Sequence, residues 1–236
     1  MKNHLKRIAA PKTWILDRQQ NIFIVRPNAG AHSLDTGMSL GIILRDILHH
    51  ASMMGEVRKI LNNKEVLVDG KRRKDHRFMV GLFDVLSFPE LKKQYRVVLD
   101  NQGRLILVEI SAAESTLKPF KVIGKTMLSK GKIQLNLYDG KNIITDKKVK
   151  VGDSIVLELP QLAFKEVLPL DPGATVFLTK GKHGGDVGKL QEIKGKEALY
   201  LANGKEIETA KSYLFVVGKK DPIITLHNST AHTKRN

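Results

Sequence analysis

Apolar residues recur with two periods along the chain, and the first of them is helical. Residues 40–48 carry the i, i+3, i+4, i+7, i+8 spacing of a buried helical stripe, namely Leu40, Ile43, Leu44, Ile47 and Leu48. Asp35, Thr36 and Ser39 precede this stretch, and their side-chain oxygens can accept hydrogen bonds from the free N–H groups of a first helical turn. After the Met-Met-Gly sequence at 53–55, residues 56–61 predict a second, shorter helix.

The second period, close to two, begins at residue 66 and is typical of strands. Val66-Leu-Val leads into an Asp69-Gly70 turn, and residues 84–88 predict the strand that closes this unit. From about residue 92 the pattern is β throughout, with runs at 95–99, 104–110, 133–138 and 149–159. Short strands with frequent turns favour a small barrel. A second β unit opens at Asp171, after Pro169.

We therefore predict an α+β, multi-domain chain in five parts. These are a basic N-terminal arm (1–37), a helix-helix-hairpin module (38–91), a central β-barrel domain (92–170), a second small barrel (171–220) and a C-terminal tail (221–236). Pro11 and Pro27 interrupt the arm, so we expect it to lie on a partner and to be mobile without one. The alternative is a solvated leader. The tail is polar, and we expect it to fray.

Charge points to a polyanionic partner. The 236 residues include 40 Lys or Arg and 24 Asp or Glu, a net charge of +16, while 42% hydrophobic residues suffice for a core. Nucleic acid is the first candidate and an anionic membrane surface the second. No apolar run approaches the roughly 18–20 residues that span a bilayer, and no hydrophobic signal region follows the basic N-terminus, which favours a cytoplasmic protein. Without Cys there is no disulfide and no thiolate zinc site.

The sequence contains no recognisable catalytic, metal or cofactor site. The Walker, Gly-x-Ser-x-Gly and His-Glu-x-x-His motifs are missing. His49-His50 is the one adjacent histidine pair, and a solvated pair near a helix C-terminus is favoured there over a metal site. Most carboxylates occupy turn positions such as Asp69, Asp100 and Asp139, where they stabilise the turn.

Three basic segments are candidates for binding nucleic acid. The first combines the two helices with the following hairpin, and residues 71–77 contain five basic residues and one acidic residue. Such a group can neutralise several phosphates. Its members are Arg45, Arg58, Lys59, Lys71, Arg72, Arg73, Lys74 and Arg77.

The second segment is rich in glycine, with four glycines in residues 181–188 that let a backbone approach a polyanion closely. Its candidate contacts are Lys180, Lys182, His183 and Lys189. The third segment is the arm, with Lys2, His4, Lys6, Arg7, Lys12 and Arg26. Trp14 can stack on an unpaired base, and the alternative is that it anchors the arm to its own protein.

Together these pieces resemble one known family. The segment from Leu40 to Phe88, with Arg58-Lys59 and Val66-Leu-Val-Asp-Gly-Lys, resembles the small RNA-binding domain first named for ribosomal protein S4. Residues 173–193 resemble a KOW motif. The N-terminal His4-Leu-Lys-Arg-Ile-Ala-Ala-Pro-Lys and the late Leu214-Phe-Val-Val-Gly-Lys are similar to the archaeal and eukaryotic ribosomal protein S4e family, which joins both modules in this order.

The resemblance implies a constituent of the small ribosomal subunit that binds small-subunit ribosomal RNA (rRNA) beside neighbouring ribosomal proteins. It implies no catalysis, no cofactor, no small-molecule substrate and no membrane, and an SH3-like KOW barrel at the C-terminal end. Asp186 and Gly184 depart from the KOW pattern at positions that are often basic, so the loop is expected to touch RNA weakly or to contact a neighbouring protein. The short tail favours an archaeal source. The alternatives are an RNA-modifying enzyme and a free translation or transcription factor with the same modules.

Overall fold

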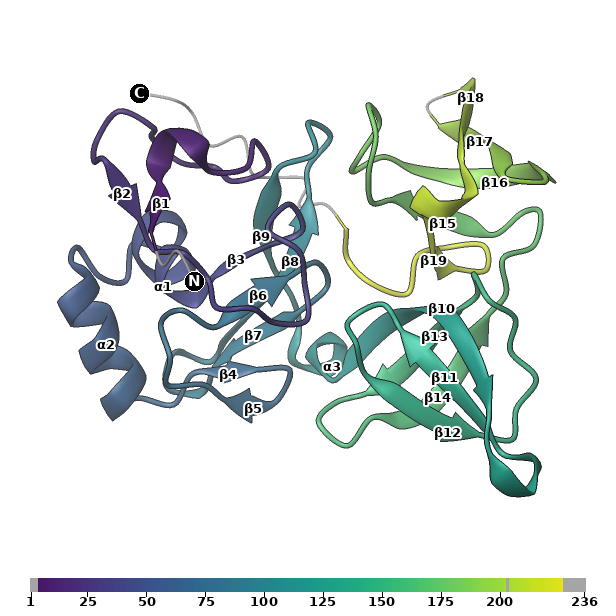
Figure 1. Ribbon diagram of the computed structural model, residues 1–236, viewed down its shortest axis with the longest axis horizontal. Coiled ribbons are helices and arrows are strands. Elements are labelled where there is room, and N and C mark those ends of the chain that lie inside the picture. The colour runs from purple at the N-terminus through teal and green to yellow at the C-terminus, as the bar shows by residue number, and fades with distance from the viewer. Residues whose placement is uncertain (1–3, 203, 227–236) are drawn as a thin grey trace.

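Three five-stranded sheets form most of the molecule, and the ten-residue helix α2 lies beside the first of them (Figure 1). The computed structural model describes residues 4–202 and 204–226. The fold is α+β and mostly β, as the sequence predicts.

The first domain builds its core from a short helical region and a sheet. Strand β3 (Gly37–Ser39) leads into α1 (Leu40–Ile42), a π-helical stretch η2 (Ile43–Ile47) and α2 (Met54–Asn63). Ser39 caps α1, because its Oγ accepts a hydrogen bond from the Ile42 N–H at 3.4 Å. The stretch is helical, as predicted, but burial does not follow the predicted stripe: Gly41 and Ile42 are buried together with Leu40, Ile43 and Leu44, while Ile47 and Leu48 are half-buried.

The sheet of this domain extends further along the chain than the sequence pattern indicates. Its strand order is β5-β4-β7-β8-β9. The strands are β4 (Leu67–Val68), β5 (Lys71–Arg72), β7 (Val85–Phe88), β8 (Lys93–Leu99) and β9 (Leu105–Glu109). Outside this sheet, β6 (Met79–Gly81) pairs with β3, and η3 (Pro89–Leu91) is a 3-10 turn. The predicted boundary at 91/92 is therefore wrong. Strand β8 pairs with β7 and buries Val97, Val98 and Leu99 in the same core as the helices.

The N-terminal segment is packed on this domain, contrary to the expectation of a mobile arm. Strand β1 (Leu5–Lys6) pairs with β2 (Phe23–Ile24), and a 3-10 turn η1 (Arg7–Ala9) follows β1. Trp14 is 2% exposed, and its Nε1 donates to the carbonyls of Leu34 and Gly37, each at 3.0 Å. The apolar residues of the segment look scattered in sequence because they fill an existing core rather than a face of their own.

The central domain is a curled sheet of order β12-β11-β10-β13-β14. Its strands are β10 (Leu117–Met127), β11 (Ile133–Leu137), β12 (Asn142–Thr145), β13 (Ser154–Glu158) and β14 (Ala163–Leu168), with the 3-10 turn η4 (Ser129–Gly131) after β10 and the short helix α3 (Ala112–Ser115) before it. The first half of β10 pairs with β13 and the second half with β11, so one long strand belongs to both halves of the sheet. Phe120, Leu135 and Leu157 are central to its core.

The C-terminal domain has the order β18-β17-β16-β15-β19. Its elements are β15 (Thr175–Leu178), β16 (Val187–Lys194), β17 (Glu197–Ala202), β18 (Lys205–Ala210), the 3-10 turn η5 (Lys211–Tyr213) and β19 (Leu214–Gly218). The chain then returns to the first domain. Ile224 and Leu226 are buried in the first core, so the expectation of a fraying tail is wrong for residues 221–226, and the predicted tail residues 227–236 lie outside the described residues.

Buried charges join the first domain to the central domain. Lys118 of β10 is 2% exposed, and its ammonium contacts Asp69, at 2.6 Å, and Asp84. Lys141 lies 2.7 Å from Asp139 and 3.1 Å from Asp69. Burial opposes the ionisation of Asp84, but Lys118 and then His32 outweigh it and hold the pKa of Asp84 below its usual range. Opposite charges from two domains thus compensate one another away from water.

Candidate nucleic-acid interface

The helices and the basic hairpin of the first domain meet at Gly41. The Gly41 N–H donates to the His76 carbonyl at 2.8 Å, and a Cβ at this position would lie 3.0 Å from that oxygen and 3.0 Å from the Met54 sulfur. The missing side chain lets the loop after β5 rest against the start of α1. Strand β5 lies near the C-terminal end of α2, because Arg72 contacts the carbonyl of Asn62 there.

Four cations of α2 and the hairpin segment are exposed, and we call them the α2–hairpin cluster: Arg58, Lys59, Lys71 and Lys74. Lys71 also borders the pocket that Asp69, Asp139 and Lys141 line between the first and central domains. Among the described residues, no carboxylate oxygen lies within 4.0 Å of the charged nitrogens of the cluster. Helix α2 influences the loop after β5 electrostatically. Burial lowers the pKa of His76 in that loop, and the positive charge of Arg58 on α2 lowers it further. Unpaired cations on a surface are suited to phosphate oxygens.

Other predicted members of this site are engaged in the fold. Arg72 donates from Nη2 to the carbonyls of Asn62, at 3.0 Å, and Lys64, at 3.5 Å, at the C-terminal end of α2. The Arg73 guanidinium lies 4.3 Å from the centre of the Phe78 ring. These residues stabilise the hairpin before they contact any partner.

Two further arginines of the prediction also have partners within the protein. Arg45 makes a two-fold contact with the adjacent Asp46, at 3.2 and 2.9 Å, which balances its charge. Arg77 is half-buried and donates from Nε to the Arg26 carbonyl at 3.2 Å, and Arg26 is itself half-buried. The Arg77–Arg26 contact connects two segments of the first domain, whereas the Arg45–Asp46 pair is local.

The predicted contacts of the N-terminal segment divide into exposed and buried side chains. His4, Lys6 and Lys12 are exposed, and Lys2 lies outside the described residues. Arg7 is wrongly predicted as an RNA contact, because it is 2% exposed and donates to the Asp17 carbonyl at 2.6 Å. Of the two alternatives for Trp14, burial selects the anchor and excludes base stacking. An Arg or Trp in a basic segment gives no sequence signal that separates these roles.

The glycine-rich loop between β15 and β16 faces its own chain. Gly185 has φ +96°, and a Cβ there would lie 1.9 Å from the Asp100 carbonyl oxygen in the β8–β9 turn. The glycines therefore permit contact between two domains, whereas the sequence suggested an approach to a polyanion. His183 is half-buried and lies 3.3 Å from Asp186. Lys180, Lys182 and Lys189 are exposed around the loop.

The central domain carries exposed cations that belong to none of the three basic segments named from the sequence. Lys125, Lys132, Lys147, Lys148 and Lys150 are all exposed. The available signal was composition, since residues 121–150 contain eight Lys and two Asp. In the described part of the chain, no group of three or more His, Cys, Asp or Glu is arranged to hold a metal ion, and no helix is long and apolar enough to cross a membrane.

Comparison with known proteins identifies the family. The model described as "Ribosomal family S4e" matches residues 91–163, and the "RS4NT (NUC023) domain" matches residues 1–35. The chain is 42% identical over 231 residues to the small ribosomal subunit protein eS4 of Methanosphaera stadtmanae, covering 95% of this chain and 96% of that relative. The chain belongs to the eS4 family.

Other eS4 proteins support the same assignment. The eS4 protein of Archaeoglobus fulgidus is 40% identical over 232 residues, covering 94% of this chain and 97% of that protein. The crystal structure of the 30S ribosomal protein S4e from Thermoplasma acidophilum is similar with a TM-score of 0.69 at 32% identity, covering 80% of this chain and 99% of that chain. The family resemblance stated from the sequence is confirmed.

Proposed function

We propose that this eS4-family chain is a structural constituent of the cytoplasmic small ribosomal subunit, where it binds small-subunit rRNA next to other ribosomal proteins and catalyses no reaction. The observation that carries the proposal is membership of a family whose curated members are named small ribosomal subunit protein eS4. The net charge of +16 and the unpaired cations of the α2–hairpin cluster supply the chemistry for phosphate binding.

The finer assignment concerns the modules. We interpret the region from α1 to β7 as the S4-type RNA-binding module and the C-terminal sheet as an SH3-like KOW domain. The order of motifs in the sequence supports this interpretation. The α2–hairpin cluster is then the principal RNA contact of the first domain, with His4, Lys6 and Lys12 as additional contacts. Lys180, Lys182 and Lys189 contribute less, because the loop that carries them rests on the β8–β9 turn and includes Asp186.

Binding of small-subunit rRNA at one fixed salt concentration tests the proposal. The variant R58Q/K59Q/K71Q/K74Q removes the α2–hairpin cluster and leaves Arg72 and Arg73 in place. We expect it to lose affinity by about tenfold or more, since each phosphate contact contributes strongly at low salt. K180Q/K182Q/K189Q should lose less.

A matched control removes four lysines from the C-terminal domain, K194Q/K196Q/K205Q/K220Q, all of which are exposed. It changes net charge by the same amount as the α2–hairpin variant. Thermal melting first establishes that each variant is folded. If the control and the α2–hairpin variant lose affinity equally, binding depends on net charge alone and the assigned site is wrong.

A further inference from the structure

The end of the central sheet farthest from the first domain collects lysines. Strand β10 ends at Met127, β11 begins at Ile133 and β12 ends at Thr145, and these three residues are paired across the sheet. Lys132 precedes β11, and Lys147, Lys148 and Lys150 follow β12, so they lie at this same end. The Lys125 ammonium donates to the Val149 carbonyl at 3.0 Å and thereby fixes the loop after β12 against β10.

These five lysines, which we call the distal lysine cluster, are exposed and unneutralised. Within residues 4–202 and 204–226, no carboxylate oxygen lies within 4.0 Å of the five ammonium groups. The opposite end of the same sheet differs, because Lys118 and Lys141 each contact aspartates there. One carboxylate, Asp146, belongs to the loop of the distal cluster.

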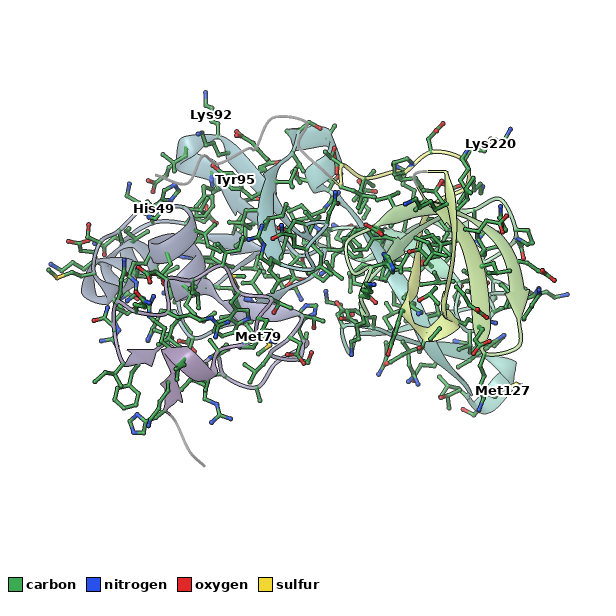
Figure 2. All side chains as sticks on the ribbon, turned by 90° about the horizontal axis from the view of Figure 1, so that it is seen from above. His49, Met79, Lys92, Tyr95, Met127 and Lys220 are labelled. Carbon is green, nitrogen blue, oxygen red and sulfur yellow. The ribbon has the colours of Figure 1, made fainter. Side chains whose placement is uncertain are left out.

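Position separates this cluster from the α2–hairpin cluster. The β10–β11 hairpin projects at the lower right of Figure 1, whereas α2 lies at the left edge of the molecule. Figure 2 shows Met127 and His49 at opposite ends of the long axis. The Lys147 ammonium lies 3.8 Å from the centre of the Phe164 ring, so part of the cluster is held in place before any partner binds.

We propose that the distal lysine cluster is a second RNA-binding surface, which takes the phosphodiester backbone of a different rRNA segment from the one bound by the α2–hairpin cluster. The inference rests on the proposed function and extends it to a protein that bridges two parts of the RNA. Because the two surfaces belong to one chain, binding of the first segment raises the effective concentration of the second.

Charge decides between RNA and a protein as the occupant. Met127 and Ile144 are 74% and 59% exposed at the same end, and such residues also occur at protein interfaces. However, a protein surface without carboxylates would remove these ammonium groups from water without compensation, which is costly. Phosphates supply a counter-charge for each of them.

Directed cleavage of rRNA gives a positional test, and the absence of native cysteines permits single tethering sites. An iron chelate that generates hydroxyl radicals is attached to S129C beside the distal cluster, to N62C beside the α2–hairpin cluster, and to K196C in the C-terminal domain as a control. We expect S129C and N62C to cleave different segments of small-subunit rRNA, with weaker cleavage from K196C.

The outcomes separate the inference from the proposed function. Cleavage from N62C without cleavage from S129C overturns the inference and leaves rRNA binding intact. No cleavage from any of the three sites, together with no measurable rRNA affinity, overturns the proposed function itself. Cleavage from S129C and N62C in one continuous segment overturns the bridging of two segments.

A charge variant provides a second measurement. K132Q/K147Q/K148Q/K150Q should lose about tenfold or more in rRNA affinity and reduce the slope of log K against log salt by roughly 3 to 4 units, since each duplex phosphate contributes about 0.9. The matched control K194Q/K196Q/K205Q/K220Q should change both quantities much less. Unchanged rRNA affinity combined with poor incorporation into the subunit would identify a protein partner and overturn the inference.

Discussion

At the scale of single residues, Lys118 shows how a buried charge can be favourable. Burial works against its ionisation, but Asp84, Asp69 and Asp139 outweigh burial and raise the pKa of Lys118 above its ordinary value. A raised lysine pKa contributes stability that is present below the unfolded value of about 10.4 and is lost only as the pH rises through the folded value. At neutral pH the pairing is therefore fully effective.

Lys118→Met should lower the free energy of unfolding at pH 7 by about 3–5 kcal/mol, because it leaves buried aspartates without their partner. The lowered pKa of Asp84 means that its contribution is present above the unfolded pKa and is lost as the pH falls. The difference between wild type and variant should consequently shrink below about pH 4. Urea unfolding at several pH values measures this difference in unfolding free energy. Lys196→Met, at an exposed turn, should change stability by less than about 0.5 kcal/mol, and a difference independent of pH would contradict the ionic assignment.

Gly185→Ala tests whether the β15–β16 loop depends on close contact with the β8–β9 turn. Gly195→Ala is the matched control, because Gly195 also has a positive φ, +63°, but a Cβ there meets no atom within 4 Å. Both changes carry backbone strain of about 1–2 kcal/mol. The Gly185 variant should lose about 1–3 kcal/mol more through overpacking. Equal losses in urea unfolding would mean that the loop is not docked.

At the scale of elements, the sequence predicts what local periodicity determines and misses what distant pairing determines. The spacing of Leu40, Ile43 and Leu44 indicates a helix, and the structure is helical there, although Gly41 and Ile42 are buried as well. Strand β8 carries no local mark that assigns it to β7 rather than to the central sheet. The prediction of a mobile N-terminal segment is wrong for the same reason, since Trp14 and Ile24 complete a core formed by later residues. The hairpin cations were visible as a run of charge, but the partners of Arg72 and Arg73 depend on the fold.

The N-terminal segment should be ordered in the free protein, and Trp14, the single tryptophan, reports on it directly. We expect blue-shifted emission that acrylamide quenches poorly and that rRNA leaves unchanged, because the indole is buried and hydrogen-bonded. Trp14→Ala should cost about 3–5 kcal/mol. Ile8→Ala is the control, with Ile8 77% exposed and an expected effect within about 0.5 kcal/mol. Emission typical of a solvated indole would mean that the N-terminal segment is mobile in the free protein.

At the scale of the whole molecule, internal pairing decides which positive charges are available to a partner. Lys118, Lys141 and Arg45 contact carboxylates, while the α2–hairpin and distal clusters do not among the described residues. Part of the chain's positive charge is therefore neutralised by contacts within the fold, and part is exposed for a partner; the net charge is +16.

Binding of the isolated protein to small-subunit rRNA should therefore depend steeply on salt. With about four to nine phosphates neutralised, the slope of log K against log salt should be roughly −4 to −8. Filter binding or fluorescence anisotropy measures this slope. The salt concentration is varied over about 50–300 mM, a range that brackets physiological ionic strength. A flat response would contradict phosphate binding by these surfaces.

The return of residues 221–226 to the first domain has a consequence for synthesis. Ile224 and Leu226 join a core whose other members include Trp14 and Leu40, and Thr225 donates from its backbone N–H to Glu114 at 2.8 Å. The first domain is therefore complete only when Leu226 has left the translating ribosome. At about 5–20 residues per second, roughly 6 to 23 s separate the emergence of Ile110 from that of Leu226. During this interval an apolar site on the nascent chain stays open, and residues 221–226 close it once they emerge.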